Sequence, residues 1–149
     1  MKVMLDTNVL FSGIIYGGKV APIVVEYVSN HYDLYLPEHA IKELNRVTAN
    51  KQPQKANEIN GNLAKLKYTL LETPLGMPKN YLDMRDSDDI PILWTAVVNK
   101  MDILITGDKD FTDIVIKKPK IMIMSTFAEK YMKGVQVYGT SNSNSNMER

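Results

Sequence analysis

Short apolar runs rich in β-branched residues alternate with segments of helical period, and this alternation limits the fold more than any other feature of the chain. It is typical of strand–helix–strand crossovers, which place parallel strands in one sheet and helices on its faces. We therefore expect a three-layer α/β/α fold around a mainly parallel sheet. The expected strands cover residues 3–5, 34–36, the neighbourhood of Leu70, 103–106 and 121–124, and the one near Leu70 has the weakest pattern.

Apolar residues recur between these runs at spacings of three and four, which is the pattern of a helix with one buried face. A polar segment with Pro53, residues 50–62, is expected to form a helical hairpin or arm, and the segment 73–80, with Pro74, Gly76 and Pro78, is expected to be a loop. The other expected helices cover residues 20–30, 40–47, 87–99 and 126–133.

The length of 149 residues fits one ordinary domain, which we place at residues 1–137. Residues 138–149 contain a Ser-Asn repeat that is too polar to join a core, so we expect a flexible tail. The chain has no cysteine, which excludes disulfides, thiolate nucleophiles and cysteine-bound metals. Any metal ion must therefore be held by oxygen or imidazole ligands.

Neither a signal peptide nor a membrane-spanning run is evident, because Asp6 interrupts the first apolar stretch and no later run is long enough. We expect a cytoplasmic protein without membrane contact. The formal net charge of +1 gives little long-range attraction for a nucleic acid, so a polyanion would have to meet local lysine patches. One such patch lies within residues 117–133, although most single lysines simply face solvent.

Two aspartates, Asp6 and Asp108, follow predicted strands directly. Open parallel sheets bind ligands in the crevice at the carboxyl ends of their strands, so we expect both aspartates at one edge of the sheet. Either aspartate alone is commonly a turn or helix N-cap residue, and the pair is more informative than its members.

Further acids lie at the borders of predicted helices. Asp89 extends the apolar stripe of the helix 87–99 backwards by one turn, whereas Asp88 is rotated from it by about 100° and is better suited to capping or solvent. Glu43 borders the buried stripe of its helix and needs a partner there. Lys42, Arg46 and a metal ion are all compatible with this position.

Four convergent acids, Asp6, Glu43, Asp89 and Asp108, would repel one another unless a cation lay among them. A ligand set made of oxygens suits Mg²⁺ or Mn²⁺ better than zinc, and such ions also bind phosphate oxygens. The reaction that this chemistry favours is phosphodiester hydrolysis.

Four segments together resemble the PIN-domain nucleases, and the resemblance extends over residues 1 to about 133. They are residues 1–10 (MKVMLDTNVL), 36–47 (LPEHAIKELNRV), 86–96 (DSDDIPILWTA) and 103–111 (ILITGDKDF). The resemblance is greatest to the toxin components of prokaryotic toxin–antitoxin pairs. It implies a Mg²⁺- or Mn²⁺-dependent ribonuclease that leaves 5′-phosphate ends, with an RNA substrate, an antitoxin partner and a homodimeric state.

The resemblance also implies residue roles. Asp6 would be the central metal ligand, accompanied by Glu43, Asp89, Asp108 and a less constant acid, Asp110. Asn8 and Thr106 would support these ligands through hydrogen bonds. Ile90 separates Asp88 and Asp89 from Pro91, a departure from the family pattern, so Asp88 stays open as an alternative third acid.

Two other interpretations compete with a metal-dependent nuclease. A phosphorelay receiver also gathers acids and Mg²⁺ at the edge of a parallel sheet and has a Lys-Pro step like Lys118-Pro119, but the strand near Leu70 lacks the aspartate that would accept the phosphoryl group. The other is a PIN fold that binds a partner and cuts RNA poorly. In the nuclease interpretation, Lys109 or a lysine of the run 117–120 would contact the RNA backbone.

Overall fold

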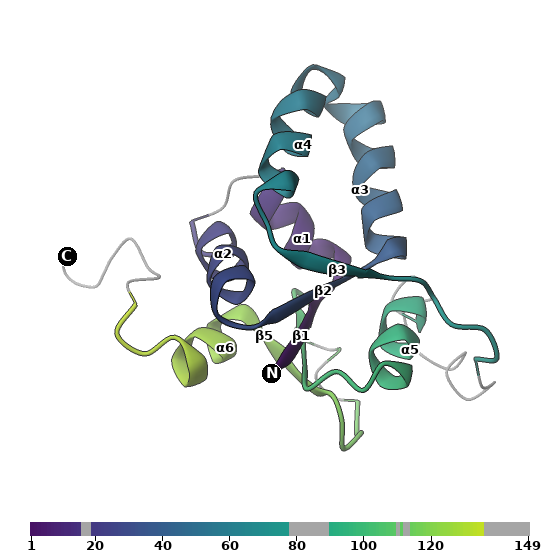
Figure 1. The fold of residues 1–149 in the computed structure, drawn as a ribbon, viewed down its shortest axis with the longest axis vertical. Coiled ribbons are helices and arrows are strands. Elements are labelled where there is room, and N and C mark those ends of the chain that lie inside the picture. The colour runs from purple at the N-terminus through teal and green to yellow at the C-terminus, as the bar shows by residue number, and fades with distance from the viewer. Residues whose placement is uncertain (16–18, 78–89, 110, 112–113, 136–149) are drawn as a thin grey trace.

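A computed structural model describes residues 1–15, 19–77, 90–109, 111 and 114–135. Its five strands form one parallel sheet in the order β3-β2-β1-β4-β5 (Figure 1). This confirms the expected sheet, including the weakly predicted strand near Leu70. The strands are β1 (Lys2–Leu5), β2 (Asp33–Pro37), β3 (Tyr68–Leu71), β4 (Ile103–Thr106) and β5 (Lys120–Ile123).

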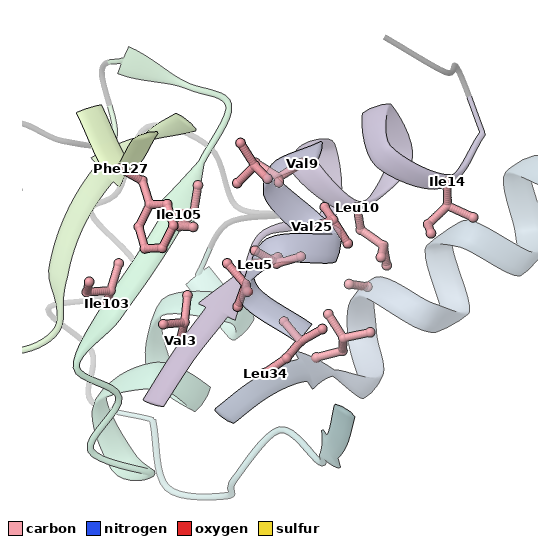
Figure 2. Close-up of a cluster of buried hydrophobic side chains, with 14 of the residues drawn as sticks. Val3, Leu5, Val9, Leu10, Ile14, Val25, Leu34, Ile103, Ile105 and Phe127 are labelled. Carbon is pink, nitrogen blue, oxygen red and sulfur yellow. The ribbon is translucent and has the colours of Figure 1, made fainter. Parts of the chain in front are cut away.

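The larger hydrophobic core lies on one face of the sheet (Figure 2). Consecutive strand residues point to opposite faces, so Val3 and Leu5 of β1 and Ile105 of β4 reach this core together. The helices that contribute to it are α1 (Thr7–Ile14), α2 (Ala21–His31), α3 (Glu38–Lys51), α4 (Ala56–Ala64) and α6 (Met124–Tyr131). Met124 begins α6, although the sequence pattern had placed it in the last strand.

A helical hairpin projects from this side of the molecule (Figure 1). It consists of α3 and α4, joined by the single 3-10 turn η1 (Pro53–Lys55). Pro53 at the first position of η1 explains the break, because proline has no backbone N–H to continue the hydrogen bonds of α3. This agrees with the hairpin or arm predicted for residues 50–62.

A second, smaller core covers the opposite face, where Met4 and Leu104 meet α5 (Ile90–Val98). The sequence spacing predicts a buried stripe of Ile90, Leu93, Trp94 and Val97 on this helix. In the structure Leu93 and Ala96 are among the most buried residues of α5 and Trp94 is only partly buried, so the buried stripe is displaced. The reason is that α5 is apolar around most of its circumference, which leaves its orientation poorly defined by sequence. The expected start of this helix at residue 87 lies outside the described residues.

Helix α1 follows β1 directly and is absent from the sequence-based prediction. Asp6 caps it, because its Oδ1 accepts a hydrogen bond of 2.9 Å from the backbone N–H of Val9. A Cβ at Gly13 would lie 2.8 Å from Cγ2 of Val25, so glycine at this position permits the close approach of α1 to α2. Asp6, the single residue between the central strand and this helix, therefore also caps the helix.

The expected flexible tail, residues 138–149, lies outside the described residues. No helix within the described part of the chain is long and apolar enough to cross a membrane.

Candidate active site at the carboxyl ends of β1 and β4

The order of the strands defines where a ligand crevice should lie. From the central strand β1 the chain moves outward through β2 and β3, and it then returns to build β4 and β5 on the other side. In such sheets the crevice opens at the carboxyl ends of the two strands between which the direction reverses. Here these strands are β1 and β4, and the residues that follow them are Asp6 and Gly107-Asp108.

Asp6 is buried at this point, with 3% of its surface exposed. Leu5 pairs with Ile105, so the next residues, Asp6 and Thr106, lie side by side and point to the face that carries α5. The Thr106 hydroxyl donates a hydrogen bond of 2.6 Å to Oδ2 of Asp6, and the backbone N–H of Gly107 donates one of 3.2 Å to the same oxygen. The Asp6 carboxylate is therefore held from both strands.

The environment of Asp6 disfavours the negative charge of its carboxylate. Burial raises the pKa of Asp6, and this effect exceeds the opposing effect of the hydrogen bonds from Thr106 and from backbone amides. No lysine or arginine among the described residues forms an ion pair with Asp6. A bound cation would stabilise the ionised form, so this carboxylate fits a divalent metal ion.

Thr106 links the two predicted aspartates. It is 1% exposed, and its Oγ1 accepts a hydrogen bond of 3.1 Å from the backbone N–H of Asp108 while its hydroxyl donates to Asp6. Asp108 itself is half-buried at the same edge of the sheet. Thr106 thus positions Asp6 and the first turn after β4 together, and its support of a metal ligand stays a prediction.

Asn8 lies next to this turn, because a Cβ built on Gly107 would be 3.3 Å from Cβ of Asn8. Its side chain is exposed and forms no hydrogen bond with Asp6 in the described structure. The backbone N–H of Asn8 contributes to holding the pKa of Asp6 down. The predicted support of the metal ligands by the Asn8 side chain also stays a prediction.

Glu43 has a protein partner in this structure. Its Oε2 accepts a hydrogen bond of 2.8 Å from Arg46 in the next turn of α3, and this contact lowers the pKa of Glu43. Lys42, the other candidate partner, pairs instead with Glu38 at 2.8 Å. The Glu43 side chain keeps 35% of its surface exposed, so its ion pair is solvated.

A complete acidic metal cluster is not formed by the residues that the structure describes. No three acids or histidines among them lie close enough together to hold one ion, so Asp6, Glu43 and Asp108 do not constitute a finished site by themselves. The other predicted acids, Asp88, Asp89 and Asp110, lie outside the described residues. The four-acid cluster therefore stays a prediction built around Asp6.

The predicted RNA-binding lysines separate into two groups. Lys109 follows Asp108 directly, at the edge of the sheet that carries Asp6. Lys120, in contrast, pairs with Ile103 at the start of β4 and β5, so the run 117–120 lies at the opposite edge. At about 3.3 Å per residue, the four residues of β5 separate the two edges by about 13 Å. This run is therefore not part of the site at Asp6.

The fold and its buried strand-end aspartate define a three-layer α/β protein with an acidic site at the switch point of its sheet. The family model described as PIN domain matches residues 2–110. The chain belongs to the PIN domain family, whose members are generally nucleases.

The fold is also found in solved structures. One is a chain from the crystal structure of VapBC2 from Rickettsia felis bound to a DNA fragment from their promoter, with a TM-score of 0.64 and 16% sequence identity. The alignment covers 82% of the present chain and 97% of the other. A search of the curated proteins finds no match.

The strand order excludes the phosphorelay receiver fold for this chain. Receiver domains have the order 2-1-3-4-5, in which the third strand is central. In this chain β3 is an edge strand, and β1 is central. The residue after β3 is Glu72, far from the switch point, so no phosphoacceptor aspartate can occupy the position that a receiver requires.

Proposed function

We propose that this PIN domain is a divalent-metal-dependent ribonuclease and the toxin component of a toxin–antitoxin pair. The observation that carries the proposal is Asp6: a buried carboxylate at the switch point of the sheet, held by Thr106 and without a described cationic partner. Burying a carboxylate costs free energy unless a positive charge compensates it. A chain that retains such a group at the position where α/β folds bind ligands is suited to binding a metal ion there.

Asp6 and Asp108 would hold the ion from the ends of neighbouring strands, joined by Glu43 and by Asp88 or Asp89, with Asp110 as a further ligand. An oxygen ligand set favours Mg²⁺ or Mn²⁺. When bound, such an ion activates a water molecule and neutralises negative charge that develops on the phosphate. Thr106 and the backbone amides around Asp6 fix the orientation of its carboxylate, as outer hydrogen bonds commonly do for metal ligands.

Glu43 would join these metal ligands by breaking its ion pair with Arg46. Because the ion pair is partly exposed to solvent, it contributes little stability and can exchange at little cost. Arg46 and Lys109 would then contact the RNA backbone. Roles for both side chains are proposed on their positions alone.

The toxin assignment is supported by the similarity of the fold to a chain of VapBC2, whose structure contains DNA from the promoter. It leads us to propose an antitoxin protein as a partner and a homodimer as the working state. A short reading frame adjacent to this one, whose product co-purifies with the chain, would agree with this part of the proposal.

The test is RNA cleavage by the purified chain. We expect a 5′-labelled single-stranded RNA to be cut in the presence of Mg²⁺ or Mn²⁺ and to stay intact when EDTA is in excess, because the metal supplies the activated water. The products should carry 5′-phosphate ends. Undiminished cleavage in EDTA would contradict metal dependence, and RNA binding without cleavage under every metal condition would favour the alternative of a PIN fold that acts by binding alone.

A further inference from the structure

A cavity lined by basic residues lies at the edge of the sheet opposite to Asp6. It has a volume of about 440 Å³, and three lysines of one short segment, Lys117, Lys118 and Lys120, line it. Ile103 and Tyr131 supply apolar surface. Because Lys120 pairs with Ile103 across β4 and β5, both residues point to the face that carries α6, whose last residue is Tyr131. The cavity is thus built by neighbouring strands and the end of a helix.

The charge of this cavity is positive. Asp102 is its one acidic lining residue, and its Oδ1 lies 3.2 Å from Nζ of Lys118. The Oδ2 of Asp102 already accepts a hydrogen bond of 2.7 Å from the backbone N–H of Lys2. Within the part of the chain that the structure describes, Lys117 and Lys120 have no ion pair. Three lysines against one aspartate leave two uncompensated positive charges, in a chain whose formal net charge is only +1.

The carboxyl end of α6 opposes this charge only weakly. A helix carries about half a negative charge at this end, which is much less than the two uncompensated lysines supply. Lys130 lies in the last turn of α6 and offsets part of it. An anion is therefore attracted to the cavity.

The aromatic side of the cavity is held rigidly. The ring of Tyr131 stacks on that of Phe127 at a centroid distance of 5.1 Å and meets the edge of Tyr32 at 6.4 Å. The Tyr27 hydroxyl donates a hydrogen bond of 3.1 Å to the backbone oxygen of Tyr131. A ligand that contacts Tyr131 would meet a surface that is already ordered, which lowers the entropic cost of binding.

We propose that this cavity binds the phosphate group of a nucleotide, either free or within an RNA strand. A volume of about 440 Å³ is within the range of small-ligand sites, and the combination of lysines with an aromatic ring matches a phosphate joined to a base and sugar. The site lies a full strand length from Asp6, so binding here is independent of the proposed nuclease activity and goes beyond it. A metal-dependent cut at one edge and phosphate binding at the other are separate properties of the chain.

The experiment measures binding in excess EDTA, which prevents cleavage, with 5′-AMP and a 12-nucleotide single-stranded RNA as probes. The variant is Lys117→Gln with Lys120→Gln, and the matched control is Lys51→Gln with Lys55→Gln, which removes two exposed lysines from α3 and η1. All four lysines are exposed, so both variants should melt at the wild-type temperature. Lys120→Arg, which keeps the charge, should retain affinity.

We expect the cavity variant to bind at least about 10-fold more weakly than the control variant. For RNA, the slope of log affinity against log salt should also fall by about 1.4, because each lost phosphate contact on a single strand contributes about 0.7. Weaker binding of both probes identifies a site for a free nucleotide, and weaker binding of RNA alone identifies a site for the strand. Equal affinity of the cavity and control variants for both probes would overturn the proposal.

Discussion

Replacement of Asp6 by asparagine should lower the rate of RNA cleavage by at least about 100-fold while the protein stays folded. Loss of an outer hydrogen-bonding partner of a metal ligand commonly costs 10- to 100-fold, and loss of the ligand charge itself should cost at least as much. Asparagine caps helices as well as aspartate does, so α1 should keep its start. Single-turnover cleavage and circular dichroism measure the two effects.

The stability of Asp6→Asn should show whether its loss of cleavage comes from unfolding. Burial raises the pKa of Asp6 above its unfolded value, so the free energy of unfolding that Asp6 contributes is largest at acid pH and is lost as the pH rises through the folded pKa. At pH 7 in EDTA, Asp6→Asn removes this buried charge but loses acceptors for Thr106 and Gly107, worth about 1 kcal/mol each. These effects oppose each other, and the melting temperature should change little.

Mg²⁺ should then change the melting temperatures of wild type and Asp6→Asn by different amounts. A ligand that binds only the folded state raises the melting temperature by mass action, so wild type should gain stability with Mg²⁺ and Asp6→Asn should gain much less. An equal rise in both proteins would show that Mg²⁺ binds elsewhere. Lowering the pH towards 3 in EDTA should raise the stability of wild type relative to that of the variant, because Asp6 becomes protonated.

Thr106→Val should destabilise the protein by about 1–3 kcal/mol at pH 7 and lower cleavage by about 10- to 100-fold. Valine matches the shape of threonine in this buried position, but it removes the donor to Asp6 and the acceptor for the backbone N–H of Asp108. Loss of the donor raises the pKa of Asp6 further, because the hydrogen bond from Thr106 lowers it. The part of the stability loss that comes from ionised Asp6 should therefore shrink as the pH falls and the carboxyl group becomes protonated.

Urea unfolding at pH 7 and pH 4, together with cleavage rates, tests this account of Thr106. Thr106→Ser is the matched control, since it keeps the hydroxyl and should preserve most of the activity. If the valine and serine variants cleave RNA equally well, the hydroxyl has no role in positioning Asp6.

Much of the fold follows from sequence for a physical reason. Central strands of a parallel sheet are buried on both faces, so β1 and β4 appear as short continuous apolar runs. The exposed edge strand β3 has the weakest pattern, but all five strands were expected at nearly their observed positions. The same logic places Asp6 and Thr106 at one edge, because parallel strands end on the same side. Helix α1 escaped prediction because Asp6-Thr7-Asn8 is equally compatible with a turn. Only the hydrogen bond to Val9 identifies Asp6 as a cap.

Other features depend on choices that local sequence leaves open. Lys42 and Arg46 are both near Glu43 in sequence, but on a helix only Arg46, three residues later, faces Glu43. Lys42 instead faces Glu38, one turn before it. The lysine run 117–120 was one of two candidates to contact the RNA backbone, and because β5 starts at Lys120 the run lies at the far edge from Asp6.

The central claim is that Asp6 holds the metal ion on which cleavage depends, and direct titration with Mn²⁺ tests it most closely. Free Mn²⁺ gives an electron paramagnetic resonance signal that disappears on binding. Asp102→Asn is the control, because Asp102 is a partly buried acid at the opposite edge of the sheet. We predict that wild type and Asp102→Asn bind Mn²⁺ alike and that Asp6→Asn binds at least about 10-fold more weakly. Equal Mn²⁺ affinity in wild type and Asp6→Asn would contradict the metal site at the carboxyl ends of β1 and β4.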